Sequence, residues 1–475
     1  MPPSPLKAKQ RASARGLAGW VLFDWAAQPF YTLVVTFLFA PYFVNGFMAD
    51  PAHGQTLWAY ATGIAQLIAA LMAPVLGAIA DAGLPRKPWI AGFSVLLVVG
   101  MSGLWFAIPH ETWLLPVVLL SFGMAIIGAE LATVFTNAMM PGLISGKRLG
   151  TLSGVGWAVG YVGGLLSLVL VAGLMVADAN TGKTLLGLDP LVPPDAATRE
   201  GDRLIGPFSA LWYFVFVLPL FLFTPDRPDK VAGAGVVKAG VSQLPRAVKE
   251  LVRNHGPIAL FLLARMLYAD GLGAVFAFGG IYAASVFGWG ATELGLFGIV
   301  LTIAGTIGAA GGGMLDDRVG SKAVIVAALC LFIAASFGVL SIDADEVLFF
   351  VPVAPKLPGG GPFASAGEQA YLAFAILIGL GAGPIQASSR TLLARLSPPD
   401  KTTEFFGFYA FSGKITAFAA PLAIGVVTAL TDSQRLGISA SLVFLVVGLL
   451  LLLRVRVRQR RGLHGSRRGL RPPSP

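Results

Sequence analysis

The chain has 475 residues, of which 56% are hydrophobic and only 12% are charged, and its mean hydropathy is +0.76. A soluble globular domain is about 25% charged, so this composition excludes an ordinary soluble domain and indicates a polytopic membrane protein. The net charge of +10 does not indicate nucleic-acid binding, because the basic residues lie at the ends of apolar segments, as the positive-inside rule describes.

The apolar segments are long and continuous rather than alternating, which predicts membrane-spanning helices instead of a barrel. We expect an all-α polytopic membrane protein with about twelve transmembrane helices in two pseudo-symmetric six-helix halves, residues 17–224 and 257–454. The remaining parts are a tail at 1–16, a charged linker at 225–256 with one short amphipathic helix, and a basic tail at 455–475. The expected spans lie near 17–47, 57–80, 89–108, 113–140, 149–176, 207–223, 257–287, 293–315, 322–341, 369–394, 404–430 and 436–454.

The charges of the connecting loops predict the orientation. Alternate loops are basic, for example at Arg86–Lys87 and Lys147–Arg148, and both terminal segments are basic too. The loops on the other side carry acids such as Asp50, Asp178 and Asp343. We therefore expect both termini in the cytoplasm of a bacterial-type inner membrane, and the first segment to be a retained tail rather than a cleaved signal peptide.

Two loops repeat at matching places in the two halves. GAIADAGLPRKP (77–88) joins the second and third spans, and GGGMLDDRVGSK (311–322) joins the eighth and ninth. Internal repeats of this kind are typical of secondary transporters. We expect Asp81, Arg86, Asp316 and Arg318 to form charge networks that gate one closed state, although each loop alone also fits an ordinary tight turn with a capping aspartate.

These loops resemble the signature loop of the major facilitator superfamily. Four further stretches resemble its vacuole-effluxer family, which is associated with amino-acid efflux during autophagy. They are FDWAAQPFYT (23–32), NAMMPGLISGKRLGTLSGVGWAVGYVGG (137–164), LYADG (267–271) and GPIQASSRTLLARLSPPDKTTEFFGFYAFSGK (383–414). The resemblance covers nearly the whole chain, and it implies a secondary active transporter that works by alternating access.

The resemblance also implies that spans 1, 4, 7 and 10 surround a central cavity. Polar and charged residues inside the spans fall mostly on these four helices, and Lys414 in span 11 is the exception. Charge within the bilayer costs about 2.5–3.5 kcal/mol per residue on insertion scales, so such residues usually face a bundle interior. The candidate substrate-binding residues are Asp24, Gln28, Glu130, Arg265, Tyr268, Asp270, Gln386, Ser389, Arg390 and Lys414.

Glu130 and Asp270 are the candidates for proton coupling. A carboxyl group near the middle of the bilayer can take up and release a proton as access to it alternates. The alternative is a permanent ion pair, with Arg265 or Lys414 as the partner of Glu130, that fixes helix packing. Asp24 allows a helix-end role as well as a functional one. Arg390 could bind an anionic substrate group, act as a gate, or extend to lipid phosphate.

The sequence offers no cofactor or metal site, since its one cysteine, Cys330, lies in an apolar run and its four histidines are scattered. The sequence also lacks a paired nucleophile and base that would indicate an intramembrane enzyme. The expected partners are a small-molecule substrate, protons as coupling ion and anionic membrane lipids that attract the basic tail, with no nucleic acid and a monomeric chain. Two alternatives stay open: a lipid or amphiphile flippase on the same fold, and a transporter-shaped sensor or scaffold.

Overall fold

The computed structural model describes residues 11–81, 84–109, 111–176, 182–184, 186–191, 195, 198–226, 244–354, 356 and 361–457. Most of the predicted tails and residues 227–243 of the predicted linker lie outside this part. The helices of the first half are α1 (Ala14–Pro29), α2 (Phe39–Tyr42), α3 (Pro51–Asp81), α4 (Lys87–Gly103), α5 (Leu115–Leu143), α6 (Leu149–Leu174), α7 (Glu200–Arg203) and α8 (Ile205–Phe223).

A separate helix, α10 (Leu244–Asn254), precedes the second half. The helices of that half are α11 (Gly256–Phe287), α12 (Ala291–Val319), α13 (Ser321–Leu340), α14 (Ala366–Leu396), α15 (Thr402–Ser412), α16 (Ala419–Thr431) and α17 (Gln434–Arg454). Two short strands, β1 (Glu346–Val347) and β2 (Val351–Pro352), pair antiparallel between α13 and α14. Short 3-10 turns precede α5, α6 and α15, at Thr112–Leu114, Gly146–Arg148 and Pro399–Lys401, and another, Leu104–Phe106, follows α4.

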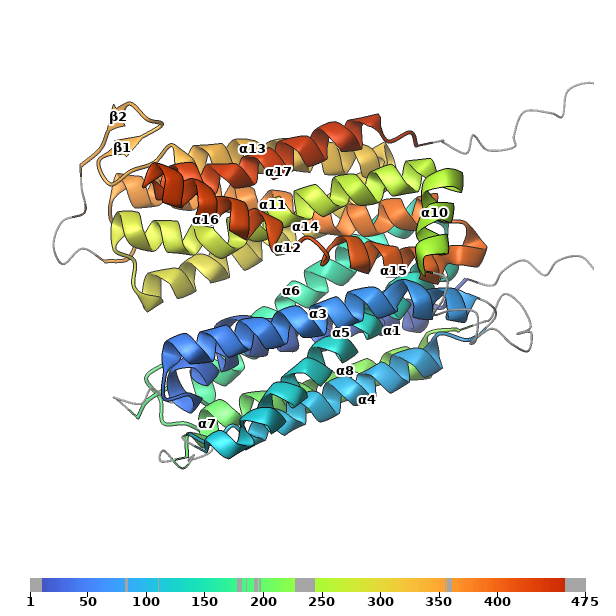
Figure 1. Cartoon of the computed structure of the whole chain (residues 1–475), viewed down its shortest axis with the longest axis horizontal. Coiled ribbons are helices and arrows are strands. Elements are labelled where there is room, and N and C mark those ends of the chain that lie inside the picture. The colour runs from blue at the N-terminus through green and yellow to red at the C-terminus, as the bar shows by residue number, and fades with distance from the viewer. Residues whose placement is uncertain are drawn as a thin grey trace, which may run out of the picture.

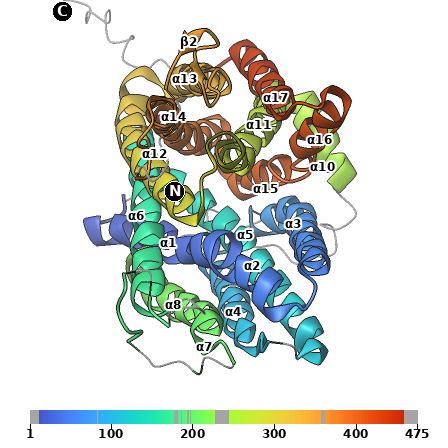
Figure 2. The same ribbon diagram turned by 90° about the vertical axis from the view of Figure 1, so that its left-hand side faces the viewer.

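Eleven helical segments in the described part are long and apolar enough to cross a membrane. They match eleven of the twelve predicted spans, which confirms an all-α, multi-pass membrane protein. Figures 1 and 2 show α1 to α8 as one bundle and α11 to α17 as a second bundle beside it. The described chain ends, before α1 and after α17, lie at the same end of the molecule (Figure 1).

The first span is helical except for a bend at Leu38, and it is not uniformly α. Wide π-type turns occupy Phe30–Phe37 and Phe43–Phe47. Pro29 has no backbone N–H, so it cannot donate to the carbonyl of Trp25 one turn earlier. The indole of Trp212 on α8 donates to that carbonyl instead, at 3.2 Å. The helix therefore widens without leaving this buried acceptor unpaired.

The prediction of one continuous helix at 404–430 is wrong. α15 ends at Ser412, α16 begins at Ala419, and tight turns connect them. Arg265 explains the break, because its guanidinium donates to the backbone carbonyl of Tyr409 at 2.7 Å. A Cβ on Gly413 would lie only 2.7 Å from the same nitrogen, so glycine makes room for the intruding side chain. The Gly413 backbone N–H also donates to the Tyr409 carbonyl, at 3.3 Å, so the guanidinium shares this acceptor at the point where the helix ends.

Candidate functional site

The two bundles contact each other most closely at the end of the molecule where the chain termini lie. On one side, Asp81 at the end of α3 meets the beginning of α15. Its carboxylate accepts hydrogen bonds from the Thr403 hydroxyl at 2.6 Å and from the Glu404 backbone N–H at 2.8 Å. Arg86 donates to Asp81 at 3.3 Å and to Thr403 at 2.9 Å. A carboxylate at a helix N-terminus is also stabilised by the helix dipole.

On the other side, Asp317 of α12 meets the beginning of α6. Its two carboxylate oxygens accept from the backbone N–H groups of Gly150 and Thr151, each at 2.8 Å. Asp317 is therefore the counterpart of Asp81, and the sequence analysis overlooked it in favour of its neighbour Asp316. We call the contacts of Asp81 and Asp317 across the two halves the latch.

Asp316 and Arg318, the two predicted gating residues of the loop at 311–322, do not bond to the first half as Asp317 does. Asp316 is fully buried and its side chain lies against Gly150 of the first half, but its polar partners belong to the second half: it pairs with Arg395 at 2.6 Å and accepts from Ser321 at 3.0 Å. The side chain of Arg318 is exposed, and it makes no hydrogen bond or ion pair to any residue that the structure describes. Arg395, which also contacts Asp317 at 3.1 Å, is the cation of this network instead.

Glycines bring the backbones together at the latch. A Cβ on Gly154 would lie 2.4 Å from the carbonyl oxygen of Ala309, and one on Gly77 would lie 2.5 Å from that of Thr403. Neither distance leaves room for a side-chain carbon. Small residues at helix crossings allow this close approach in membranes. The α6–α12 and α3–α15 crossings therefore have the same construction.

Arg390 of α14 joins the two halves at a second level, next to the latch. Its guanidinium donates to Asp24 at 3.0 Å, to Asn137 at 3.1 Å, and to both the hydroxyl and the carbonyl of Ser153, at 2.8 and 2.7 Å. All three acceptors belong to the first half, and only 3% of Arg390 is exposed. The guanidinium also lies over the Trp20 ring, 5.0 Å from its centroid. Arg390 thus pairs across the interface and does not extend to lipid phosphate.

A third layer lies deeper between the halves. Glu130 of α5 and Lys414, in the break after α15, form an ion pair at 3.0 Å. Their side chains keep 15% and 27% of their surface exposed, so this pair is more accessible than Arg390. Both residues line a narrow crevice between α3, α5 and α15 that is too small for a water molecule, together with Ala69, Ala70, Ala73, Leu131, Val134 and Ala410. Glu130 is 13 residues from the end of α5, which corresponds to about 20 Å, near mid-bilayer.

Gln386 also reaches the opposite half, because its amide donates to the Tyr161 hydroxyl of α6 at 2.9 Å. Gln28 lies on the α6-facing side of α1, where it contacts Gly164. Tyr161, which is not among the candidate residues selected from the sequence, joins them here through its contact with Gln386. Its position one helical turn after Trp157 was the only local signal.

Three candidates lie within the second half rather than between the halves. Arg265 bonds to Tyr409 and Ser412 of α15 and lies over the Tyr409 ring, 3.4 Å from its centroid. Tyr268 and Ser389 share a hydrogen bond of 2.7 Å between α11 and α14, and both are buried. These contacts hold together the helices that surround the break.

Asp270 has no ion-pair partner among the described residues, whereas Asp24, Glu130 and Asp316 each have one. Only 6% of Asp270 is exposed, and its Oδ2 atom has no hydrogen-bond partner among the described residues. The same is true of the Thr416 hydroxyl, which lies in the break after α15. The Oδ2 atom of Asp316 also has no hydrogen-bond partner among the described residues, but its Oδ1 pairs with Arg395. Thr416 and Arg265 are the groups that interact electrostatically with the Asp270 carboxyl group. An unsatisfied carboxyl group at this depth is costly, which is characteristic of functional positions.

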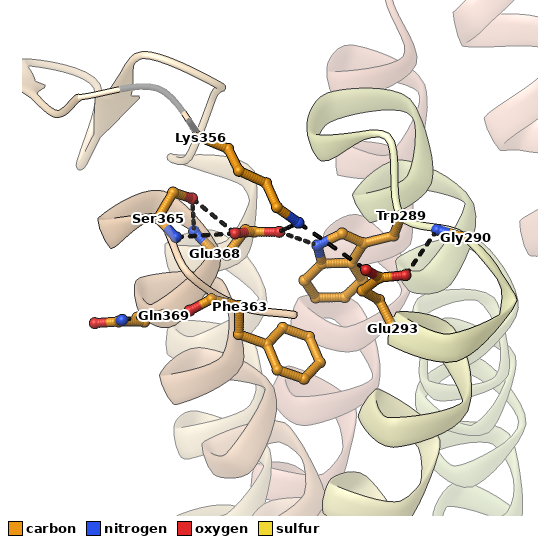
Figure 3. Close-up of polar contacts among 8 residues, drawn as sticks. All are labelled: Trp289, Gly290, Glu293, Lys356, Phe363, Ser365, Glu368 and Gln369. Carbon is orange, nitrogen blue, oxygen red and sulfur yellow. Dashed lines mark hydrogen bonds and ion pairs between the residues drawn. The ribbon is translucent and has the colours of Figure 1, made fainter. Parts of the chain in front are cut away.

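A separate polar cluster lies at the opposite end of the second half (Figure 3). The Glu368 carboxylate is fully buried and accepts from Trp289 at 2.9 Å, from Lys356 at 3.0 Å and from the Ser365 backbone at 3.0 Å. Lys356 also lies 4.0 Å from Glu293 of α12. This cluster fastens the ends of α12 and α14 to the segment after β2. In the described part, no group of three or more histidine, cysteine or acidic residues could hold a metal ion.

Comparison with known proteins identifies the family. The profile of the vacuole effluxer Atg22-like family matches residues 52–463. YxiO of Bacillus subtilis, described as an uncharacterized MFS-type transporter, is 26% identical over 438 residues, which cover 91% of this chain and 93% of that protein. Autophagy-related protein 22 of Cryptococcus neoformans is 28% identical over 322 residues, 65% of this chain and 53% of the fungal protein. The chain thus matches about half the length of this fungal relative.

Solved structures show the same fold. The transporter FucP in its outward conformation matches with a TM-score of 0.69 at 14% identity, over 94% of this chain and 99% of FucP. An outward-facing bacterial homologue of the iron transporter ferroportin matches with a TM-score of 0.66 at 15% identity, over 93% and 98% of the two chains. Family and structural neighbours are transporters rather than enzymes. The chain belongs to the vacuole effluxer Atg22-like family and is a multi-pass secondary transporter with the major facilitator fold.

Proposed function

We propose that this transporter moves a small polar organic solute, amino-acid-like or anionic, by alternating access coupled to protons. The observation on which the proposal rests is the Glu130–Lys414 ion pair, which joins the two halves at mid-depth and keeps part of its surface exposed. A substrate that has both an acidic and a basic group can replace each member of this pair with its own charge. Separation of the pair by substrate then frees the halves to move.

The latch supports a conformation that is closed at one end. Asp81, Asp317 and Arg390 join the halves at and near that end, whereas the Glu130–Lys414 pair keeps some exposed surface. The basic residues of the loops assign the latch end to the cytoplasm by the positive-inside rule. In this interpretation the conformation is outward-facing, and the opposite conformation requires the latch and the Arg390 contacts to break.

Asp270 is the better candidate for the coupling proton. Glu130 already has a partner, because Lys414 forms an ion pair with it at 3.0 Å. Asp270 lacks a hydrogen bond at Oδ2, and a proton on that atom could be donated to the nearby Thr416 hydroxyl. Thr416 and Lys414 belong to the same break in span 11. Protonation of Asp270 and separation of Glu130 from Lys414 would therefore both act on this segment, which couples the two events.

The proposal is tested by transport into proteoliposomes under an imposed pH gradient. We expect Asp270→Asn to abolish pH-driven flux while exchange of substrate at equal pH continues, since the neutral amide resembles the protonated carboxyl group. Glu130→Gln should reduce both activities by about tenfold or more, because it leaves Lys414 without its counter-charge. Proton coupling through these residues is wrong if both variants keep pH-driven flux at the unmodified level.

A further inference from the structure

The place of helix α10 in the chain predicts that it lies at the membrane surface. It ends at Asn254, and the spanning helix α11 begins at Gly256, so a single residue, His255, separates them. In Figure 1, α10 runs across the latch end of the molecule, crosswise to α11 and near α15, and Figure 2 places it at the outer edge of the second bundle. This position puts the helix at the boundary between the hydrocarbon and the lipid headgroups.

The side chains of α10 suit that boundary. Leu251 is buried against the bundle, whereas Val248 and Val252, one turn apart, are 40% and 63% exposed. Lys249 and Arg253 form an adjacent exposed row. Exposed valines are unfavourable in water but stable among acyl chains, and a neighbouring basic row is attracted to anionic headgroups.

Two contacts connect α10 and its junction with α11 to the latch. Glu250 forms an ion pair with Lys401, the last residue of the turn that precedes α15. The hydrogen bond that Lys401 donates to Glu250 raises the pKa of Lys401 above its ordinary value, so the lysine stays charged. The His255 ring packs edge-on against Phe405 of α15, with ring centroids 5.1 Å apart.

The connected residues are close neighbours of the latch in sequence. Thr403 and Glu404, which bond to Asp81, stand two and three residues after Lys401. A displacement of Lys401 therefore changes the position of the helix N-terminus that Asp81 holds. Since an exposed ion pair contributes little free energy by itself, the connection biases the latch and does not control it outright.

We propose that α10 binds the anionic lipid headgroups of the surrounding membrane and that this binding stabilises the closed latch through Glu250 and Lys401. The inference rests on the proposed alternating-access function, because it requires a second conformation in which the latch is open. Anionic lipid on the latch side should raise the ratio of closed to open molecules by on the order of fivefold.

The test measures distances between spin labels at the latch end in nanodiscs. The labels are attached at Pro88→Cys in the first half and Arg318→Cys in the second, in a Cys330→Ser background; both label positions are exposed. The nanodiscs contain phosphatidylcholine alone or phosphatidylcholine with phosphatidylglycerol. We expect phosphatidylglycerol to increase the short-distance population in this parent protein.

Two variants test the route of the effect. Lys249→Gln/Arg253→Gln removes the attraction to the lipid, and Glu250→Gln removes the connection to Lys401 while leaving the basic row intact. Both should abolish the response to phosphatidylglycerol. The control Lys147→Gln/Arg148→Gln removes two exposed basic residues from the same end of the molecule and should keep the response.

The outcomes separate the inference from the function that underlies it. If the parent populates two distances but phosphatidylglycerol does not shift them, or if Glu250→Gln responds like the parent, the coupling through α10 is wrong and alternating access stands. If every protein shows one fixed distance, even with Asp81→Asn, then both the inference and the proposed function are overturned.

Discussion

The carboxylate of Asp317 accepts from two backbone N–H groups in the first turn of α6, and the carboxylate of Asp81 accepts from one backbone N–H and one threonine hydroxyl in the first turn of α15. Each aspartate belongs to one half, and each helix N-terminus belongs to the other. The two halves are therefore held together at two separate places, where α3 meets α15 and where α6 meets α12. The latch is symmetric in this respect although the loops that form it differ in sequence.

We expect Asp81→Asn and Asp317→Asn each to weaken the closed latch. A hydrogen bond to a charged group contributes about 1.5–3 kcal/mol, so each variant should shift the closed-to-open ratio by about tenfold or more. Reaction of single cysteines, introduced at the latch, with a water-soluble thiol reagent measures the open fraction. Arg318→Gln is the matched control, since this exposed side chain has no described partner, and it should leave the reaction rate unchanged.

The close approach of α6 and α12 gives a second prediction. Gly154→Ala places a carbon 2.4 Å from the Ala309 carbonyl oxygen, so the helices must move apart and the closed latch is lost. We expect a lower melting temperature and faster cysteine labelling at the latch. Gly311→Ala on α12 is the control because a Cβ there meets nothing within 4 Å. Equal behaviour of the two variants would exclude tight packing as the reason for glycine at this crossing.

The spans could be predicted from the sequence because each depends on a local property, a run of about 20 apolar residues. The break after α15 could not, since Gly413 resembles any transmembrane glycine until Arg265, far away in sequence, approaches it. Asp317 could have been selected over Asp316 from spacing alone: Gly77 precedes Asp81 by four residues, as Gly313 precedes Asp317.

The partners of the buried charges were beyond prediction for a related reason. Local patterns place Arg390 and Glu130 on inner helices, but pairing depends on how the two halves dock. Hydropathy carries no information about that docking. The sequence thus left the choice between Arg265 and Lys414 as the partner of Glu130 open, and only the folded arrangement selects Lys414.

A charge exchange separates the two roles that Glu130 could have. Glu130→Lys and Lys414→Glu alone each place two like charges within contact distance and should abolish transport. If the pair serves only packing, the double variant should recover most activity, because the attraction is restored. Our account predicts recovery of the melting temperature without recovery of transport, since the substrate would meet reversed charges.

The cluster in Figure 3 makes a stability prediction that does not involve transport. Lys356→Met removes the cation beside the buried carboxylate of Glu368 and should destabilise the protein by about 1–3 kcal/mol, read as a lower melting temperature. Glu368→Gln in the same chain should restore part of the loss. Lys183→Met is the control, because Lys183 and Asp189 pair at an exposed position where an ion pair contributes little.

The most direct test of the account measures both ends of the molecule at once. One pair of spin labels stands at the latch end, at Pro88→Cys and Arg318→Cys, and a second pair stands at the opposite end, at Trp113→Cys and Leu430→Cys, in separate proteins. The account predicts that Asp81→Asn/Asp317→Asn lengthens the first distance and shortens the second. Distances that stay fixed at both ends, or that lengthen together, would contradict alternating access around the Glu130–Lys414 pair.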